Sequence, residues 1–340
     1  MRVLCYGAGA IGTLVGGYLA RSGNTVALVG RPNHVGAVNQ KGLTVLRPGA
    51  PPERVSLRAY TSLAQALADG FDPQLVLLTV KGYDTPAATT DLQAMAPGIP
   101  VLTLQNGIGN EELLARALGA ERTLSGCITL SVALPEPGSV QLHSTHGGIG
   151  LASLAGNIAP VAALFAEAGF AVVTFEDWRA LKWSKLLLNM LGNAVCAILD
   201  LPPEAVFRDR ALCALEKAAF SEALAVMRAQ KLQPVDLPGF PVRLLAFLFR
   251  WLPPALLSSL LAGRLGAGRG DKMPSLWLDL QKGRKESEVA QLNGAVAARG
   301  GELGVPTPAN TLIANALCEI LADPSRREYY RHNASAILGC

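Results

Sequence analysis

Six residues near the start of the chain constrain its fold more than any other segment. Gly7–Gly12 reads G-A-G-A-I-G; it follows a short apolar run, Arg2–Tyr6, and opens a stretch with helical spacing, Ile11–Ser22. In a βαβ unit that binds a dinucleotide, the first glycine of such a motif allows a tight turn. The second lets the backbone approach a pyrophosphate, and the third lets the helix pack against the strand. We therefore predict a cofactor-binding turn formed by Gly7, Ala8, Gly9, Ala10, Ile11 and Gly12.

The first half of the chain alternates between apolar runs and helical patterns. Thr25–Val29, Gln74–Val80 and Pro100–Leu104 are continuous apolar runs, which are typical of strands buried on both faces of a parallel sheet. Helical spacing lies between them, so this half is predicted to form successive βαβ units. Shorter alternating runs over residues 126–153 predict antiparallel strands that close the first domain.

The second half has mostly helical patterns. The predicted helices are Trp178–Leu199, Glu204–Gln230, Leu244–Leu265, Met273–Gly300 and Asn310–Leu321. We therefore predict an α/β protein with a Rossmann-type, doubly wound parallel sheet over residues 1–176. An all-helical substrate and catalytic domain is predicted over residues 177–340. Within it, residues 237–272 form an apolar, arginine-rich insertion.

The composition excludes a disordered chain and argues against a membrane protein. Half of the 340 residues are hydrophobic and 16% are charged, which excludes a largely disordered chain. The longest uncharged piece of the most apolar segment is Trp251–Gly263, which contains Pro253-Pro254. A membrane span needs about 20 consecutive apolar residues. We therefore predict that the protein has no membrane partner.

Charge and cysteine usage narrow the partners and the compartment. The net charge of +4 includes no long basic run, so no nucleic acid partner is predicted. The six cysteines are scattered without a C-x-x-C pair, which is typical of free thiols in a reducing cytoplasm. The four histidines have no carboxylate or cysteine partners at ligand spacing, so no metal site is predicted.

The end of the second predicted strand indicates which dinucleotide binds. In NAD sites this strand usually ends in Asp or Glu, which holds the ribose 2′-OH, but here it ends Val29-Gly30-Arg31. The missing acid predicts NADPH/NADP+, with Arg31 paired to the 2′-phosphate; the alternative is a solvated surface arginine. Lys81 and Asn106 also follow predicted strands, at the edge where parallel sheets bind ligands. A loop lysine and an Asn-Gly turn explain these two residues equally well.

An apolar helical segment, Leu181–Leu199, carries polar residues along one stripe. Lys185, Asn189 and Asn193 recur at i, i+4 and i+8, and burying such groups without partners is costly. The stripe either faces solvent or lines a polar cleft between the domains, and the surrounding leucines favour the cleft. A lysine there could protonate a developing alkoxide and attract a carboxylate substrate.

These features, in this order, resemble the ketopantoate reductase (2-dehydropantoate 2-reductase) family over nearly the whole chain. The set Trp183, Lys185, Asn189 and Asn193, with Glu288 downstream, is more specific than the glycine turn, which many dehydrogenases share. The other matching residues are Arg31, Lys81, the Gln105-Asn106-Gly107 turn, Ser275, Asp279, Leu292-Asn293-Gly294 and the ending Gly304–Asn310.

The resemblance implies a role for most of these residues. NADPH binds along Gly7–Gly12 with Arg31 on its 2′-phosphate, and Lys81 and Asn106 lie near the nicotinamide. Hydride passes to the keto carbon of the substrate, and Lys185 is the general acid that protonates the carbonyl oxygen. The residues that are expected to hold the substrate are Glu288, on its distal hydroxyl, together with Asn106, Asn189, Asn193 and Ser275.

The sequence departs from the family pattern in two places. Arg284–Glu288 is one residue longer than usual, which leaves Glu286 as an alternative to Glu288. The larger departure is the 237–272 insertion, for which we expect an extra helical hairpin over the cleft or at a subunit interface. The residues that perform the reduction are therefore retained better than those that would select the substrate.

We predict a cytoplasmic, NADPH-dependent oxidoreductase that reduces a small anionic 2-oxo acid to a 2-hydroxy acid. The leading reaction is 2-dehydropantoate (ketopantoate) to pantoate, in pantothenate and coenzyme A synthesis, and a homodimer is one expectation for its assembly. One alternative is an enzyme of the same fold that acts on another 2-oxo or 3-hydroxy acid. The second is a non-catalytic protein that senses NADP(H), although a sensor has no need of the proton donor Lys185.

Overall fold

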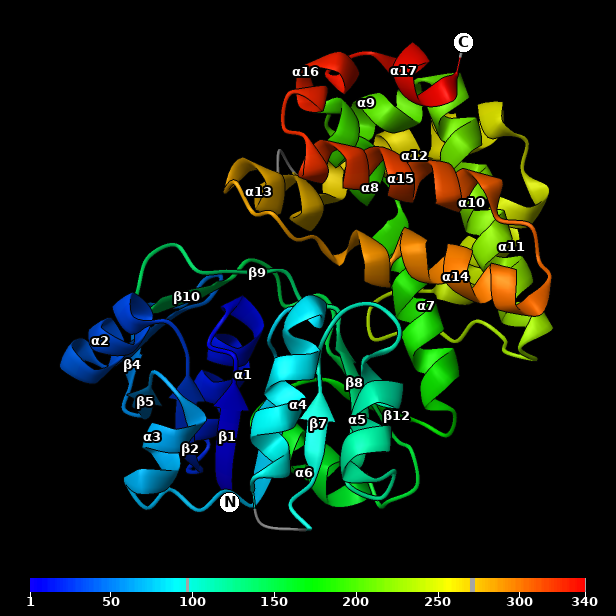
Figure 1. Cartoon of the computed structure of the whole chain (residues 1–340). Coiled ribbons are helices and arrows are strands. Elements are labelled where there is room, and N and C mark those ends of the chain that lie inside the picture. Colours follow the sequence, from blue (N-terminus) through cyan, green and yellow to red (C-terminus); the bar gives the residue numbers. More distant parts are fainter. Residues whose placement is uncertain (96–97, 270–272, 340) are drawn as a thin grey trace. The chain divides into compact units, whose positions relative to one another are not determined.

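The computed structural model describes residues 1–95, 98–269 and 273–339, with the side chains of residues 262–269 outside the description. Part of the predicted insertion, residues 270–272 and the side chains of Arg264 and Arg269, therefore lies outside the described residues. The chain divides into two compact units (Figure 1). Unit 1 comprises Met1–Gln105, Gly109–Lys182 and Asp236–Phe240, and unit 2 comprises Asn106–Ile108, Trp183–Val235 and Pro241–Cys340.

In the described part of unit 1, eight strands form one twisted sheet in the order β12-β11-β8-β7-β6-β1-β2-β5. Neighbouring strands are parallel except for β11 and β8, which are antiparallel. The strands are β1 Arg2–Tyr6, β2 Thr25–Val29, β5 Arg58–Tyr60, β6 Leu75–Leu78, β7 Val101–Thr103, β8 Thr123–Ile128, β11 Ile149–Ser153 and β12 Val172–Phe175. The predicted doubly wound parallel sheet is confirmed.

The strand order reverses direction beside β1, which pairs with β2 on one side and with β6 on the other. Tyr6 at the end of β1 is in register with Val29 of β2 and with Leu78 of β6. A doubly wound sheet binds ligands at such a switch point, beyond the carboxyl ends of its strands. The segments that follow Tyr6, Val29 and Leu78 are therefore brought to the ligand-binding edge.

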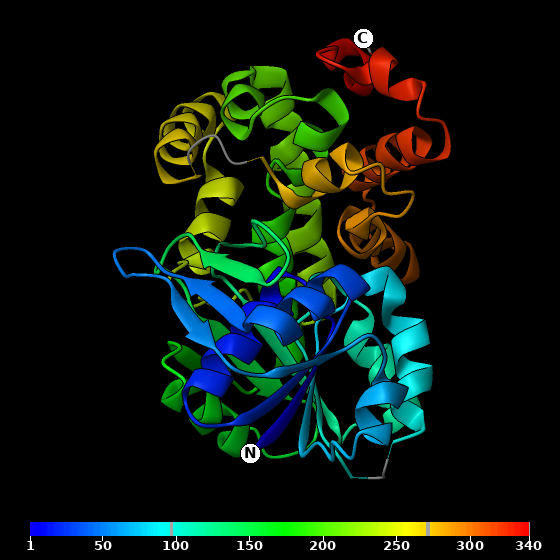
Figure 2. The ribbon, with the colours of Figure 1, turned by 90° about the vertical axis from the view of Figure 1, so that its left-hand side faces the viewer.

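Helices cover both faces of this sheet and bury its alternating side chains. Val3 and Cys5 of β1 belong to a core with α1 (Ala10–Arg21) and α6 (Ala159–Glu167). The intervening Leu4 belongs to a second core, which the other face shares with the helices α3 Leu63–Ala68, α4 Thr85–Gln93 and α5 Asn110–Leu118. Figure 2 shows α4 and α5 (cyan) on one side of the sheet and α6 (green) on the other. Two-sided burial explains why a central strand such as β6 is apolar at every position.

The structure bears out the antiparallel strands predicted over residues 126–153 only in part. β11 is antiparallel to β8, as predicted, but β8 is parallel to β7 in the large sheet. β9 (Val132–Ala133) and β10 (Ser139–Leu142) form a second, four-stranded sheet with β3 (Leu43–Leu46) and β4 (Glu53–Val55). Within it β10 is antiparallel to β9 but parallel to β3. Such short strands carry too little alternation to reveal their partners from sequence alone.

Unit 2 is helical, and most of its helices are shorter than the sequence pattern predicts. Four of the five predicted helices are broken: at Gly192, at Asp209, at Pro253-Pro254 and over residues 282–287. The resulting elements are α7 Trp178–Met190, α8 Asn193–Leu199, α9 Pro203–Arg208, α10 Arg210–Ala229, α11 Val242–Trp251, α12 Pro254–Arg269, α13 Ser275–Gln281, the 3₁₀ turn η2 Glu288–Gln291, α14 Asn293–Leu303, α15 Pro308–Ala322, α16 Arg326–Tyr330 and α17 Ala334–Leu338. Three of the four breaks have a local cause: Gly192 has φ of +64°, Asp209 caps α10 through its side chain, and proline interrupts helical hydrogen bonding.

No helix among the described residues has both the length and the apolar character that are needed to cross a membrane.

Candidate functional site

The glycine turn after β1 is shaped by close backbone contacts that a side chain would prevent. Gly7 has φ of +118°, and a Cβ there would lie 2.6 Å from the nitrogen of Val80. A Cβ on Gly12 would lie 2.2 Å from the carbonyl oxygen of Gly7. Thr79 fixes the same oxygen, because its hydroxyl donates to it at 2.7 Å. The first and third glycines therefore have structural roles that no other residue can fill.

Gly9 differs from these two glycines because nothing lies within 4 Å of the position that its Cβ would take. It is the N-cap of α1, and the amides of Ala10 and Ile11 begin the helix. The first N–H groups of a helix have no intrahelical acceptor, and the helix dipole favours an anion beside them. Open space in front of a helix N-terminus fits a pyrophosphate group, so the described residues fit a dinucleotide here.

Arg31 lies directly beyond the carboxyl end of β2. It is exposed and is the N-cap of α2 (Pro32–Lys41). A hollow of about 500 Å³ lies beside it, lined by Arg31, Pro32, Asn33, His34, Leu134, Pro135, Glu136 and Pro137. Its size is in the range of small-molecule sites, and the arginine is its cationic group.

His34 forms part of the floor of this hollow in a neutral form. Its ring is buried, which lowers its pKa. Nδ1 accepts a hydrogen bond from the amide of Gly138 at 3.1 Å, and Nε2 lies 3.2 Å from the hydroxyl of Thr13. Both ring nitrogens are engaged by the protein, so His34 supports the shape of the hollow and does not add a positive charge to it.

Lys81 lies at the switch point, three residues beyond β6. It is partly exposed and precedes the short 3₁₀ turn η1 (Gly82–Asp84). The Gln105 side chain holds this segment in place: its Nε2 donates to the carbonyl oxygen of Val80 at 3.0 Å, to that of Lys81 at 3.3 Å and to the hydroxyl of Thr85 at 2.8 Å. Lys81 is therefore located on an anchored loop.

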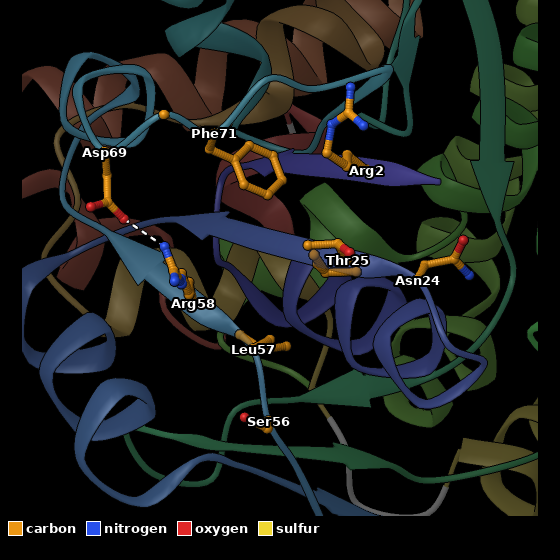
Figure 3. A pocket seen from close by; sticks show the side chains of 10 residues that line it. Arg2, Asn24, Thr25, Ser56, Leu57, Arg58, Asp69 and Phe71 are labelled. Atoms are coloured by element: carbon orange, nitrogen blue, oxygen red, sulfur yellow. Dashed lines mark hydrogen bonds and ion pairs between the residues drawn. The ribbon is translucent and has the colours of Figure 1, made fainter.

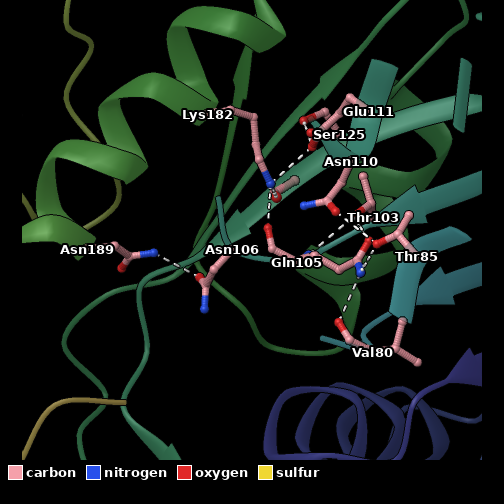
Figure 4. A network of polar contacts seen from close by, with 11 residues as sticks. Val80, Thr85, Thr103, Gln105, Asn106, Asn110, Glu111, Ser125, Lys182 and Asn189 are labelled. Carbon is pink, nitrogen blue, oxygen red and sulfur yellow. Dashed lines mark hydrogen bonds and ion pairs between the residues drawn. The ribbon is translucent and has the colours of Figure 1, made fainter. Parts of the chain in front are cut away.

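A buried polar network that the sequence analysis missed lies beneath this loop (Figure 4). Lys182 of α7 and Glu111 of α5 form an ion pair with 3.0 Å between Nζ and Oε1, at 1% and 0% side-chain exposure. The ammonium also donates to the carbonyl oxygen of Gln105. The one signal in the sequence was a lysine between Leu181 and Trp183 in an apolar segment.

Within unit 2, the second half of α7 has a narrow, partly exposed face that carries two polar side chains. Lys185, Leu188 and Asn189 are partly exposed, whereas the residues around them are buried. The amide nitrogen of Asn189 donates to Oδ1 of Asn106 at 3.0 Å (Figure 4). The predicted residues Lys185, Asn189 and Asn106 thus belong to one neighbourhood of the same unit.

The stripe does not continue along one helix as predicted, because α7 ends at Met190 and Asn193 begins α8. Asn193 nevertheless stays beside Asn189, since its amide nitrogen donates to the carbonyl oxygen of Asn189 at 3.0 Å. The same nitrogen lies 3.3 Å from the hydroxyl of Ser275, and its Oδ1 accepts from the amide of Leu276 at 3.1 Å. Asn193 therefore joins α7, α8 and the start of α13.

The turn between α7 and α8 rests on a fully buried carboxyl group. Oε2 of Glu216, on α10, accepts a hydrogen bond from the amide of Gly192 at 3.0 Å. Burial disfavours the charged form and raises the pKa of Glu216 to about 7, although the amide of Gly192 opposes the shift. This carboxyl group therefore titrates near neutral pH.

Glu288 and Glu286 have different surroundings. Glu288 begins η2 and is 3% exposed, whereas Glu286 is exposed. The far end of η2 contacts the turn that carries Asn106: the amide of Ile108 donates to the carbonyl oxygen of Gln291 at 3.0 Å. A Cβ on Gly107, whose φ is +84°, would lie 2.5 Å from Cβ of Gln291. The turn and η2 are therefore packed closely together within unit 2.

A second hollow in unit 1, of about 450 Å³, lies at the opposite edge of the sheet (Figure 3). It is lined by the amino ends of β1 and β2 and by the segment around Phe71. Its arginines have carboxylate partners: Arg58 lies 2.8 Å from Asp69, and Arg2 lies 2.8 Å from Asp72. Ligands of doubly wound sheets bind at the carboxyl ends of the strands, so we assign no cofactor to this hollow.

The described residues contain no group of three or more His, Cys, Asp or Glu side chains arranged to hold a metal ion.

Comparison with known proteins identifies one family across both units. The family model described as ketopantoate reductase PanE/ApbA matches residues 3–156, and the model of its C-terminal part matches residues 177–320. The resemblance inferred from the sequence motifs is confirmed.

Relatives named 2-dehydropantoate 2-reductase occur in several organisms. The protein of Pyrococcus horikoshii is 35% identical over 211 residues, which cover 61% of this chain and 66% of that protein, just under two thirds of its length. The protein of Archaeoglobus fulgidus is 28% identical over 318 residues, which cover 92% and 96% of the two chains.

Solved structures share the fold. The PanE/ApbA family ketopantoate reductase of Ralstonia eutropha is 31% identical, with a TM-score of 0.79, and the match covers 96% of this chain and all of that one. D-mandelate dehydrogenase, solved with NADH and anilino(oxo)acetate, is 21% identical with a TM-score of 0.78 over 97% of this chain and 99% of that one. The second likeness shows the fold alone.

Proposed function

Because the chain belongs to the PanE/ApbA ketopantoate reductase family, we propose that it reduces a small 2-oxo acid to a 2-hydroxy acid with NADPH. The leading substrate is 2-dehydropantoate, which would give pantoate for pantothenate and coenzyme A synthesis. The observation that carries this proposal is the partly exposed face of α7, where Lys185 lies one turn from the hydrogen-bonded pair Asn189 and Asn106.

The cofactor is assigned to residues 1–176. The open N-terminus of α1 at Gly9 would hold the pyrophosphate, and Arg31 would pair with the 2′-phosphate from the rim of its hollow. An exposed guanidinium suits this role because it can bind phosphate through two parallel hydrogen bonds. Lys81 would lie near the nicotinamide. When bound, the reduced nicotinamide supplies the hydride.

Catalysis is assigned to residues 177–340. Lys185, as its ammonium, would protonate the carbonyl oxygen as hydride reaches the keto carbon, which avoids a free alkoxide. Lys185 is partly exposed on α7, in contrast to the fully buried Lys182. The positive charge would also attract an anionic substrate.

Substrate binding is assigned to the polar groups around this lysine. Asn189, Asn106 and Ser275 would contact the substrate directly. Asn193 would act with them, and its hydrogen bonds to Asn189 and Ser275 support a role in holding both in place. Glu288 is favoured over Glu286 for the distal hydroxyl.

Two properties beyond the reaction complete the proposal. We place the protein in the cytoplasm, which is supported by the absence of disulfide bonds at the described Cys5, Cys127, Cys196, Cys213 and Cys318. A homodimer is the assembly we propose. It is supported by the exposed apolar side chains of Leu244, Phe247 and Trp251 on α11, and analytical ultracentrifugation would test it.

Product analysis tests the proposed reaction. The protein is incubated with NADPH and ketopantoate, and mass spectrometry should find pantoate in amounts that match the NADP+ formed. Turnover of a different 2-oxo acid would move the assignment to another reductase of the same fold. Tight binding of NADPH without any product would support the alternative of an NADP(H) sensor.

A further inference from the structure

The ion pair of Lys182 and Glu111 is fully buried, although removing its two charges from water is unfavourable. The two side chains are 1% and 0% exposed, and the second carboxylate oxygen of Glu111 has no hydrogen-bond partner among the described residues. Removing two charges from water carries a large penalty, and well-packed apolar residues often serve stability as well. Stability alone therefore does not account for the pair.

The ammonium of the pair contacts two backbone carbonyl groups, those of Gln105 and Gly126. Nζ of Lys182 donates to the carbonyl oxygen of Gln105 and lies 3.4 Å from that of Gly126, while Oε1 of Glu111 occupies its third side at 3.0 Å (Figure 4). Ser125 donates to the same Glu111 oxygen at 2.9 Å. All three N–H groups of the ammonium thus have acceptors, and their directions are fixed.

Gln105 is held by its side chain as well as by its backbone. Its Nε2 donates to Val80 and Thr85, and its Oε1 accepts from the hydroxyl of Thr103 at 2.9 Å. Asn106 is the next residue along the chain, so the orientation of the Gln105 carbonyl group restricts the direction in which the Asn106 side chain leaves the backbone. Asn106 then meets Asn189 at 3.0 Å.

We propose that Lys182 and Glu111 are positioning residues, whose ion pair orients the 105–107 turn so that Asn106 is presented to the ligand. This inference rests on the proposed function for the identity of that ligand. Lys182 donates to the Gln105 carbonyl group, and Glu111 holds the ammonium in the direction that this contact needs. Neither residue contacts the reacting atoms.

A double-mutant cycle between Lys182→Met and Asn106→Ala tests the inference. A misplaced polar group can cost about 10- to 100-fold in rate, so Lys182→Met should lower kcat/KM by about tenfold or more. In the Asn106→Ala background the same change should cost less than about twofold, because the residue through which it acts is gone. Full, independent losses in both backgrounds would overturn the proposal.

A further variant separates positioning from stability. Lys182→Met alone leaves Glu111 buried without a partner, whereas Lys182→Met with Glu111→Leu removes both charges and should recover most of the thermal stability. The recovered variant should still have the low kcat/KM. Leu164→Ala on α6 is the matched control, since it removes a buried apolar side chain far from the network in sequence and should leave the kinetics unchanged below its melting temperature. Wild-type kinetics in the charge-free variant would contradict the proposal.

Backbone amide hydrogen exchange, measured without ligand, tests the inference without relying on the enzymatic reaction. The charge-free variant should exchange faster than wild type over residues 105–109, which include the amide of Ile108, while Leu164→Ala should not. Unchanged exchange there overturns the inference. Absence of any NADPH-dependent turnover in the wild-type protein would instead overturn the proposed function, and the exchange result would still stand.

Discussion

The side-chain amide of Asn189 donates to Oδ1 of Asn106 at 3.0 Å, which joins α7 to the 106–108 turn within unit 2. Each of these two asparagines holds the other in a defined orientation. Lys185 precedes Asn189 by one helical turn on the partly exposed face of α7. This arrangement places a potential proton donor beside two oriented amide groups, and the first prediction concerns that donor.

Replacing Lys185 with alanine removes the proposed general acid. We expect kcat to fall by at least about 10²-fold, the low end of what a general acid contributes, with little change in the Kd for NADPH. Steady-state kinetics and fluorescence titration measure the two effects. Lys282→Ala, which changes an exposed lysine, is the control and should behave like wild type. Near-normal turnover of Lys185→Ala would remove Lys185 from the mechanism.

Arg31 is predicted to select NADPH over NADH. Arg31→Ala should weaken NADPH binding by about 10- to 100-fold, since a hydrogen bond between charged groups contributes about 1.5–3 kcal/mol. Binding of NADH should hardly change, because it lacks the 2′-phosphate. Calorimetric titration of both cofactors measures the difference, with the exposed Arg54→Ala as control. Equal losses for the two cofactors would show that the assignment of NADPH is wrong.

The two neighbouring glutamates should respond differently to the same neutral substitution. Glu288→Gln should raise KM or lower kcat/KM for ketopantoate, because the buried Glu288 is the group we assign to the substrate's distal hydroxyl. Glu286→Gln changes an exposed side chain and should have little effect. Parallel kinetics of the two variants provide the comparison. A larger loss in Glu286→Gln would transfer the role to that residue.

Glu216 should make the stability of the protein depend on pH. Its folded pKa of about 7 lies above the ordinary value of 4.5, so the folded protein holds this proton more tightly than the unfolded chain. The stabilisation is fully present below about pH 4.5 and is lost as pH rises through about 7. A shift of this size corresponds to a loss on the order of 3 kcal/mol in the free energy of unfolding.

Denaturant titrations at several pH values check this prediction. Glu216→Gln keeps an acceptor for the amide of Gly192 but cannot ionise, so it should match wild type near pH 5 and exceed its stability near pH 8. Glu121→Gln, at an exposed position, should follow the wild-type curve throughout. If Glu216→Gln and wild type change in parallel with pH, the carboxyl group does not titrate as described.

The parallel sheet was predictable because its strands are apolar at nearly every position and separated by helical patterns. The small sheet was not, because β9 and β10 have only two and four residues and β10 pairs with β3, about 95 residues earlier in the sequence. The helix break at Gly192 was also missed, since periodicity does not show that a glycine will adopt φ of +64°. The hydrophobic pattern of a segment indicates its secondary structure. It does not show which distant segment that helix or strand will contact.

The candidate site shows the same division. Arg31, Lys185 and Asn189 could be proposed from sequence because each follows a strand or repeats along a helix face. Lys182 was missed because a lysine is usually solvated, and its partner Glu111 lies 71 positions away in the sequence. Burial of such a pair is visible only once both helices are placed.

The rate of NADPH oxidation by the wild-type protein, across a panel of 2-oxo acids that includes ketopantoate, tests the central claim most directly. We predict that at least one small 2-oxo acid accelerates NADPH loss, that ketopantoate gives the highest kcat/KM, and that NADH is a much poorer donor. If no 2-oxo acid changes the rate of NADPH loss at any concentration, the protein is not the reductase that we propose.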